Sequence, residues 1–155
     1  MTYSNSTAYD TLAIAEVITG DAFAPTHATI REFCEASLDH NPLHLDDKYV
    51  HDNFASKSEF DGIVMHGMSQ YSMYMKMLTD WMHPIGGVHR RLETRWLKPV
   101  KPGDVVTPSA IITSRQKTER SSWIVLAVKM SNQRGETVST GEATVEFPQG
   151  SQGLE

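Results

Sequence analysis

The chain has 155 residues and a mass of 17.3 kDa, which suits one domain with a hydrophobic core of its own. Apolar residues make up 39% of it and charged residues 21%, so the composition excludes an intrinsically disordered chain. It carries 14 Lys and Arg against 19 Asp and Glu, and the net charge of −5 argues against nucleic acid or an anionic membrane as a partner.

The compartment can be inferred from three further features. The sequence has no run of about 18 apolar residues that could span a membrane, and its polar N-terminus is unlike a signal peptide. The one cysteine, Cys34, excludes an intrachain disulfide and fits a reducing compartment. We therefore expect a cytoplasmic protein without a membrane span.

The first part of the chain predicts helices. Residues 1–25 are expected to be an N-terminal extension with the first strand region. Thr26 then follows Pro25 as the predicted N-cap of a helix that ends at Leu38. The helix cannot continue through Asn41-Pro42, because a residue before proline is displaced from the helical conformation. A weaker helix is predicted over residues 47–54.

The strongest helical pattern covers His66–Met82. One face carries residues at helical spacing: Met68, Tyr71, Ser72, Met75, Leu78 and Met82. More apolar residues lie on other faces of the same segment. A helix that is apolar over most of its circumference is expected to be buried, with its methionines as core filler.

The remaining residues predict an antiparallel sheet. Strands are expected at residues 88–97, 105–114, 124–130 and 137–147, with turns at residues 101–104 and 132–136. The fold class is α+β with a single domain, and an antiparallel sheet wrapped around the long helix is one way to bury both. Residues 148–155 are expected to be a flexible tail.

Two short segments can carry chemistry. In the first, Asp39 and His44 flank Pro42, which predicts a loop that can point both side chains at one water molecule. In the second, Gly67 lies at the start of the long helix, where backbone N–H groups have no helical acceptor and can bind a carbonyl oxygen that gains charge. The alternatives are a polar surface loop and a glycine that only makes room for packing.

A metal site is not expected. His40 and His44 have a spacing that would suit zinc on a helix, but Pro42 interrupts the helix between them.

The two segments together resemble the MaoC-like family of hot-dog hydratases, which includes the (R)-specific enoyl-CoA hydratases. The resemblance rests on Asp-His-Asn-Pro-Leu-His at residues 39–44 and on Ile-Val-Met-His-Gly-Met at residues 63–68. It extends through Trp-Leu-Lys-Pro-Val at residues 96–100 to the last strand, and so covers roughly residues 26–147.

The resemblance implies a hot-dog domain over residues 26–147, pairing into a homodimer or larger oligomer. The implied reaction adds water reversibly to a trans-2-enoyl thioester, forming (R)-3-hydroxyacyl-CoA from an enoyl-CoA without a metal or redox cofactor. Asp39 and His44 would be the acid/base pair. Gly67 would polarise the thioester carbonyl, with Gly62 as the alternative donor. The supporting residues would be Asn41, His66 and Ser72.

Three departures from the family pattern bear on the substrate. Leu38 stands where the family usually has Gly, the spacer between His44 and His66 is several residues longer than usual, and Met65 stands where a small residue is common. These changes are expected to narrow or alter the acyl pocket in favour of a branched, polar or otherwise specialised acyl group.

A basic segment has two interpretations. Its members are Arg90, Arg91, Arg95, Lys98 and Lys101. They are candidate contacts for the phosphates of coenzyme A or of a carrier's phosphopantetheine; the alternative is a solvated strand face.

Two other functions are compatible with the fold that the resemblance implies. One is a hot-dog acyl-CoA thioesterase, which would also use a carboxylate and a helix-start N–H but would cleave the thioester. The other is a non-catalytic acyl-thioester-binding subunit of a hot-dog assembly.

Overall fold

The computed structural model describes residues 5–54, 56 and 59–148. In chain order the elements within them are α1 (Asn5–Thr11), β1 (Val17–Thr19), α2 (His27–Ser37), the 3-10 turn η1 (Pro42–His44), α3 (Asp47–Phe54), α4 (Gly67–Met82), the 3-10 turn η2 (His83–Ile85), β2 (Val88–Trp96), β3 (Val106–Lys117), β4 (Ser121–Asn132) and β5 (Thr137–Pro148).

The strands of the described part form a five-stranded antiparallel sheet in the order β1-β3-β4-β5-β2. The hairpin between β4 and β5 turns at Gly135, whose φ of 77° is a left-handed conformation that glycine adopts without strain. β2 comes first among the long strands in sequence but pairs with β5, so it forms one edge of the sheet.

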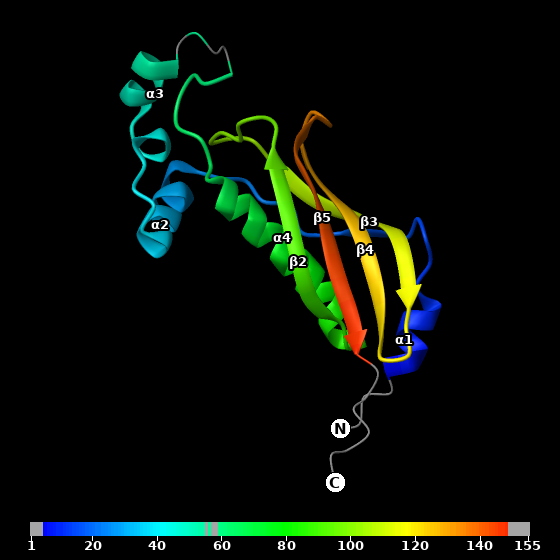
Figure 1. Cartoon of the computed structure of the whole chain (residues 1–155). Helices are drawn as coiled ribbons and strands as arrows, with labels where there is room; N and C mark the ends of the chain where they lie inside the picture. The colour runs from blue at the N-terminus through cyan, green and yellow to red at the C-terminus, as the bar shows by residue number, and fades with distance from the viewer. Residues whose placement is uncertain (1–4, 55, 57–58, 149–155) are drawn as a thin grey trace.

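One face of the sheet carries the core. In β4 the residues Ile124, Leu126, Val128 and Met130 are buried, as their strict alternation predicts. They belong to the same cluster as Tyr74 and Leu78 of α4. α4 lies along this face in Figure 1. The expected α+β architecture, an antiparallel sheet packed on one long helix, is therefore confirmed.

The expected burial of α4 on most sides is wrong. The buried residues form one stripe: Gln70, Tyr74, Met77, Leu78 and Met82. Met68, on the predicted core face, is 51% exposed. A single sheet covers a helix on one side only, and apolar residues spread around the helix do not reveal which side that is. The Tyr74 hydroxyl lies 2.9 Å from Ser139 Oγ and ties the buried stripe to β5.

α2 and α3 lie where the sequence predicts helices, whereas α1 was not predicted. Thr26 caps α2 as predicted, accepting from the Thr29 N–H in a capping box. The region up to residue 25 contains α1 and β1, and β1 joins the sheet beside β3. The predicted tail lies outside the described residues beyond Pro148.

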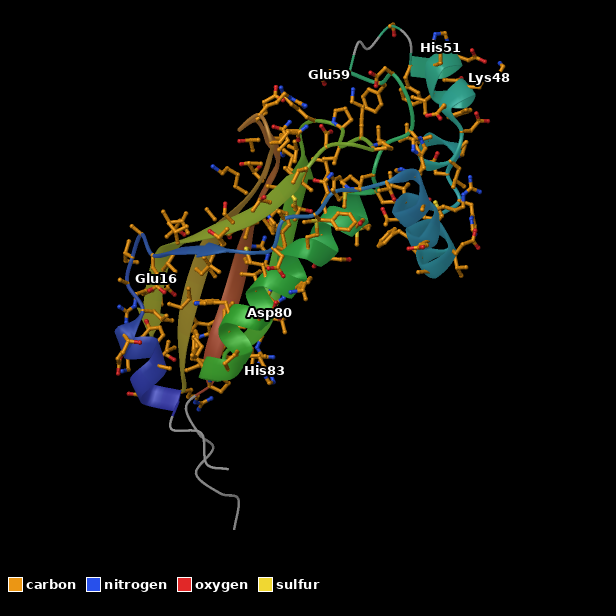
Figure 2. All side chains as sticks on the ribbon, turned by 180° about the vertical axis from the view of Figure 1, so that it is seen from behind. Glu16, Lys48, His51, Glu59, Asp80 and His83 are labelled. Carbon is orange, nitrogen blue, oxygen red and sulfur yellow. The ribbon has the colours of Figure 1, made fainter. Side chains whose placement is uncertain are left out.

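The overhang, defined here as α2, η1 and α3, extends beyond one end of the sheet (Figure 1). Lys48, His51 and Glu59 lie at this end, whereas Asp80 and His83 lie at the other end of α4 (Figure 2). The start of α4 thus meets the overhang. Among the described helices, none is long and apolar enough to cross a membrane.

Candidate active site

The loop after α2 positions Asp39. Leu38 ends the helix with a φ of 60°, a left-handed conformation that glycine normally supplies. Asn41 then caps η1, with its Oδ1 accepting from the Leu43 N–H at 3.0 Å. The Asn41 N–H donates to Asp39 Oδ1 at 3.3 Å. Asn41 therefore supports the turn, and the Asp39 carboxylate remains half exposed.

His44 is held by the segment that leads into α4. This histidine is buried, and its Nδ1 lies 2.7 Å from the main-chain carbonyl of Val64. A carbonyl can only accept, so Nδ1 carries the hydrogen and donates it. In the neutral ring, Nε2 is then the nitrogen with a free lone pair. His44 is thus oriented as a base whose second nitrogen can take a proton.

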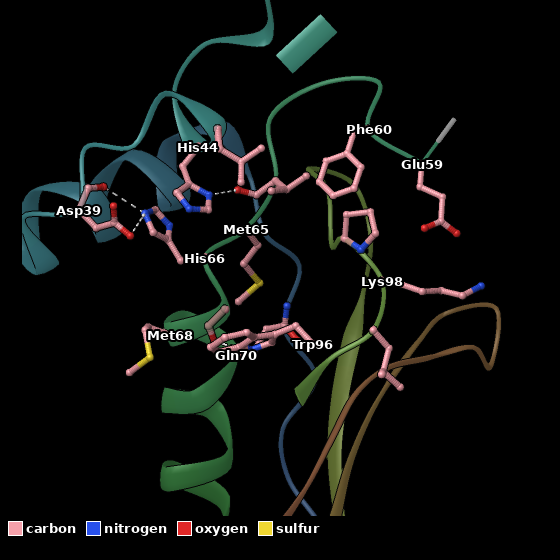
Figure 3. Close-up of a pocket in the computed structure, with 15 residues that line it drawn as sticks. Asp39, His44, Glu59, Phe60, Met65, His66, Met68, Gln70, Trp96 and Lys98 are labelled. Atoms are coloured by element: carbon pink, nitrogen blue, oxygen red, sulfur yellow. Dashed lines mark hydrogen bonds and ion pairs between the residues drawn. The ribbon is translucent and has the colours of Figure 1, made fainter. Parts of the chain in front are cut away.

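The segment before α4 is itself fixed by two loops. The Val64 N–H donates to the Leu43 carbonyl at 3.3 Å, and the Met65 N–H donates to the Val100 carbonyl at 2.7 Å. The next residue, His66, contacts Phe33 and Cys34 of α2 and stacks on His44. Figure 3 shows the resulting row of Asp39, His66 and His44 on one side of the pocket.

The three side chains converge. A carboxylate oxygen of Asp39 and a ring nitrogen from each of His44 and His66 all lie within 4.8 Å of one another. One water with two hydrogen bonds of about 2.8 Å can bridge a gap of roughly 4.6 Å. A separation of 4.8 Å or less brings Asp39 and His44 within reach of one water.

The same three groups are poorly arranged for a metal ion. The rings of His44 and His66 are stacked, with centroids 3.6 Å apart and planes inclined by 23°. The lone pairs of an imidazole lie in its ring plane, so two nearly parallel rings direct them side by side and not toward one ion.

The three side chains open onto a pocket of about 420 Å³. Its walls are mostly apolar and are completed by Leu43, Glu59, Phe60, Val64, Met65, Gly67, Met68, Gln70, Trp96, Leu97, Lys98 and Pro99. A mostly apolar cavity of this size with a few convergent polar groups is typical of a small-molecule site. Met65 lines the pocket, so its side chain is in a position to narrow the space for an acyl group.

The helix start contributes Gly67 to the pocket wall. Among the described residues no acceptor receives the Gly67 N–H. Trp96 lies across this glycine, with its indole Nε1–H donating to the Gly67 carbonyl at 3.1 Å. A Cβ built on Gly67 would lie 2.4 Å from the indole ring. Only glycine therefore fits between the pocket and Trp96.

We expect Gly67→Ala to lower kcat/KM for an enoyl thioester about 10- to 100-fold, since the indole must move and the adjacent N–H donor moves with the helix start. The measurement is steady-state kinetics, with Ser69→Ala in the same helical turn as the matched control. Wild-type kinetics in the Gly67 variant would show that this N–H has no part in turnover.

Two of the predicted site residues, Ser72 and Gly62, do not line the pocket. The Ser72 hydroxyl is exposed and donates to the Met68 carbonyl at 3.0 Å, one turn back in its own helix. Gly62 lies against Asp47, where a Cβ would be 2.8 Å from the carboxylate oxygen. The Asp47 carboxylate caps the neighbouring Ile63 N–H at 2.8 Å. The structure thus favours Gly67 over Gly62 as the donor to a substrate.

The basic segment divides into two groups. Arg90 is paired with Glu146 and Arg91 with Glu93 and Glu142, while Arg95 lies on the exposed edge strand β2. None of these three lines the pocket. Their placement agrees with a solvated strand face.

Lys98 is the member of the basic segment that lines the pocket. Its Nζ donates to Glu136 Oε1 at 2.8 Å. Lys101 pairs with Asp61 at 2.8 Å just outside.

Glu136, the partner of Lys98, holds several polar side chains together. It accepts from Asn132 Nδ2, Lys98 Nζ and Arg134 Nε, each at 2.8 Å. These three hydrogen bonds lower the pKa of Glu136 from 4.5 to about 2, and the bond from Asn132 has the largest effect. Because the folded pKa lies below the ordinary one, the stabilisation is complete above pH 4.5 and is lost as the pH falls toward 2.

We therefore expect Glu136→Gln to flatten the fall in unfolding free energy between pH 4.5 and pH 2. Urea unfolding at a series of pH values measures it, with the exposed Glu93→Gln as control. An unchanged acid dependence would mean that the folded Glu136 titrates as it does in the unfolded chain.

The sequence did not single out three residues that shape the site. Cys34 is buried against His66, Val64 orients His44 through its carbonyl, and Trp96 covers Gly67. In the sequence Cys34 stands out only as the single cysteine. Neither a main-chain carbonyl nor an indole packed across the helix start leaves a sequence signal of its own.

Comparison with known proteins identifies a family and several relatives. Residues 11–142 match the family described as MaoC like domain. The (R)-specific enoyl-CoA hydratase of Aeromonas caviae is 30% identical over 121 residues, covering 78% of this chain and 85% of that protein. The mitochondrial 3-hydroxyacyl-[acyl-carrier-protein] dehydratase of Arabidopsis thaliana is 28% identical over 120 residues, covering 77% of this chain and 68% of that protein.

The fold is also similar to a solved structure. The structure of the (R)-hydratase from A. caviae involved in PHA biosynthesis superimposes with a TM-score of 0.76 and 25% identity, covering 89% of this chain and 98% of that one.

Proposed function

The chain belongs to the MaoC-like domain family of hydratases and dehydratases, and on that premise we propose that it adds water reversibly across the double bond of a trans-2-enoyl thioester. The substrate is an enoyl-CoA and the product an (R)-3-hydroxyacyl-CoA. The observation that carries the proposal is the distance of at most 4.8 Å between an Asp39 oxygen and a His44 ring nitrogen, in the pocket that Gly67 also lines.

The chemistry balances with these groups. Asp39 and His44 hold one water and take a proton from it as its oxygen bonds to C3 of the substrate. The electron pair of the double bond moves toward the thioester, and the Gly67 N–H stabilises the negative charge on the carbonyl oxygen. The acid/base pair then returns a proton to C2. Substrate and product differ by one water, so the step needs no redox cofactor.

The similarity to the A. caviae hydratase supports coenzyme A as the thiol and the (R) configuration of the product. The similarity to the Arabidopsis dehydratase, named for acyl-carrier-protein substrates, supports the reverse direction on a carrier. We favour an enoyl-CoA over a carrier-bound substrate because the A. caviae hydratase is more similar to this chain, in identity and in the share of its length that is covered, than the Arabidopsis dehydratase.

The site is suited to an oligomer. Met68, Trp96 and Leu97 line the pocket and are each about half exposed, at 51%, 49% and 50%. β2 is also an edge strand with one unpaired side. We propose that a second copy of the chain covers this surface, and that the dimer or larger homo-oligomer works in the cytoplasm.

Hydration of crotonyl-CoA tests the function. We expect loss of the enoyl-thioester ultraviolet absorbance without release of free thiol, and loss of this activity in Asp39→Asn. Release of thiol would instead identify a thioesterase. No turnover of crotonyl, branched or dicarboxylic enoyl-CoA would favour a non-catalytic binding subunit.

A further inference from the structure

His66 is the one member of the row at the pocket for which the proposed reaction has no direct use. Its side chain is almost fully buried, at 2% exposed. One ring face stacks on His44 with centroids 3.6 Å apart, and Phe33 packs nearby at 4.9 Å. A buried polar ring in contact with two catalytic groups is costly unless its nitrogens are used, so its contacts are informative.

The contacts of Nε2 determine where the hydrogen lies. This nitrogen is 3.3 Å from the main-chain carbonyl oxygen of Asp39 and 3.5 Å from the Cys34 sulfur. If Nε2 carried a lone pair to accept from the thiol, that lone pair would also face the carbonyl oxygen and repel it. With the hydrogen on Nε2, the ring donates to the carbonyl, and the sulfur lies within range as a weak second acceptor.

The other nitrogen supports a neutral ring. Among the described residues His66 Nδ1 has no hydrogen-bond partner and is buried. A hydrogen there would be an unsatisfied buried donor. Burial also lowers the pKa of His66, which disfavours the imidazolium. The ring is therefore a neutral donor and takes no proton from Asp39, whose Oδ2 lies 3.9 Å from Nε2.

From these contacts we propose that His66 is a positioning residue that aligns both catalytic groups, holding Asp39 through its main-chain carbonyl and His44 through ring stacking. The inference rests on the proposed function. It explains how Asp39, on an exposed turn after a left-handed Leu38, keeps a fixed relation to His44. Cys34 completes the buried side of the cluster by contacting His66, and it does not itself line the pocket.

Two substitutions at His66 separate the donor from the ring. His66→Phe keeps an aromatic ring and removes the donor, so we expect kcat to fall about 30-fold or more with KM within about threefold. His66→Gln keeps an amide N–H able to reach the Asp39 carbonyl, and we expect it to retain kcat within about tenfold of wild type. The control is His89→Phe, which removes a similar imidazole contact, Nε2 to the Arg91 carbonyl at 3.0 Å, on β2 outside the pocket.

Each outcome decides the matter. A Phe variant within about threefold of wild-type kcat, or a Gln variant no better than the Phe variant, overturns the positioning role. A wild-type protein that hydrates no enoyl thioester contradicts the proposed function instead. The tautomer is then read without activity, by nitrogen NMR of labelled histidine at neutral pH. The inference requires a protonated Nε2 and an unprotonated Nδ1 in His66; a hydrogen on Nδ1 overturns it.

Discussion

Replacement of Asp39 by Asn is expected to lower kcat for hydration of crotonyl-CoA about a thousandfold, in the middle of the range for loss of a general acid or base. The amide has the shape of the carboxylate, and its oxygen can still accept from the Asn41 N–H. In the wild type this N–H donates to Asp39 Oδ1 at 3.3 Å. It cannot take a proton from water. The expected signature is therefore lost kcat with an unchanged fold.

The measurement is steady-state kinetics with thermal unfolding of the same preparations. The side chain is half exposed, so we expect the melting temperature to stay within about 2 °C of wild type. Asp52→Asn is the matched control, because Asp52 is an acid of the overhang that pairs with Lys48 outside the pocket. If the Asp39 variant retained more than about a tenth of the activity, Asp39 could not be an acid/base group.

Replacement of His44 by Asn is expected to lower kcat about 100- to 1,000-fold. The Asn amide nitrogen takes the place of Nδ1 and can keep the bond to the Val64 carbonyl, which is 2.7 Å long in the wild type. Asn has no second nitrogen to accept the proton, so this variant separates the structural from the chemical part of His44.

His83→Asn is the control, since His83 is exposed at the far end of α4 (Figure 2). The double variant Asp39→Asn with His44→Asn should lose little more kcat than the worse of the two single variants, because both groups act on the same water. Fully multiplicative losses would mean that Asp39 and His44 act in separate steps.

The sequence predicts the elements of this fold where one periodicity dominates. The alternation in β4 and the capping of α2 at Thr26 are confirmed. β1 spans only Val17–Thr19, too short for a pattern to emerge. α4 shows the opposite difficulty, because its apolar residues cover most faces, and the sheet alone determines that Tyr74 is buried and Met68 exposed.

The sequence predicts which residues form the candidate site but not the contacts that orient them. The motifs predict Asp39, His44 and Gly67 as site residues, and the structure brings them to one pocket. The contacts that orient them join distant segments, such as His44 with Val64 and His66 with Asp39. No local pattern specifies these. Ser72 shows the risk of transferring a residue by position, since its hydroxyl bonds within its own helix.

The most direct test of the hydratase account follows the oxygen atom of water. Crotonyl-CoA is incubated with the protein in water labelled with heavy oxygen, and the products are analysed by mass spectrometry and chiral chromatography. We expect an intact thioester with one heavy oxygen at C3 in the (R) configuration, formed by wild type and not by Asp39→Asn. Heavy oxygen in a free carboxylate, with release of coenzyme A, would contradict it.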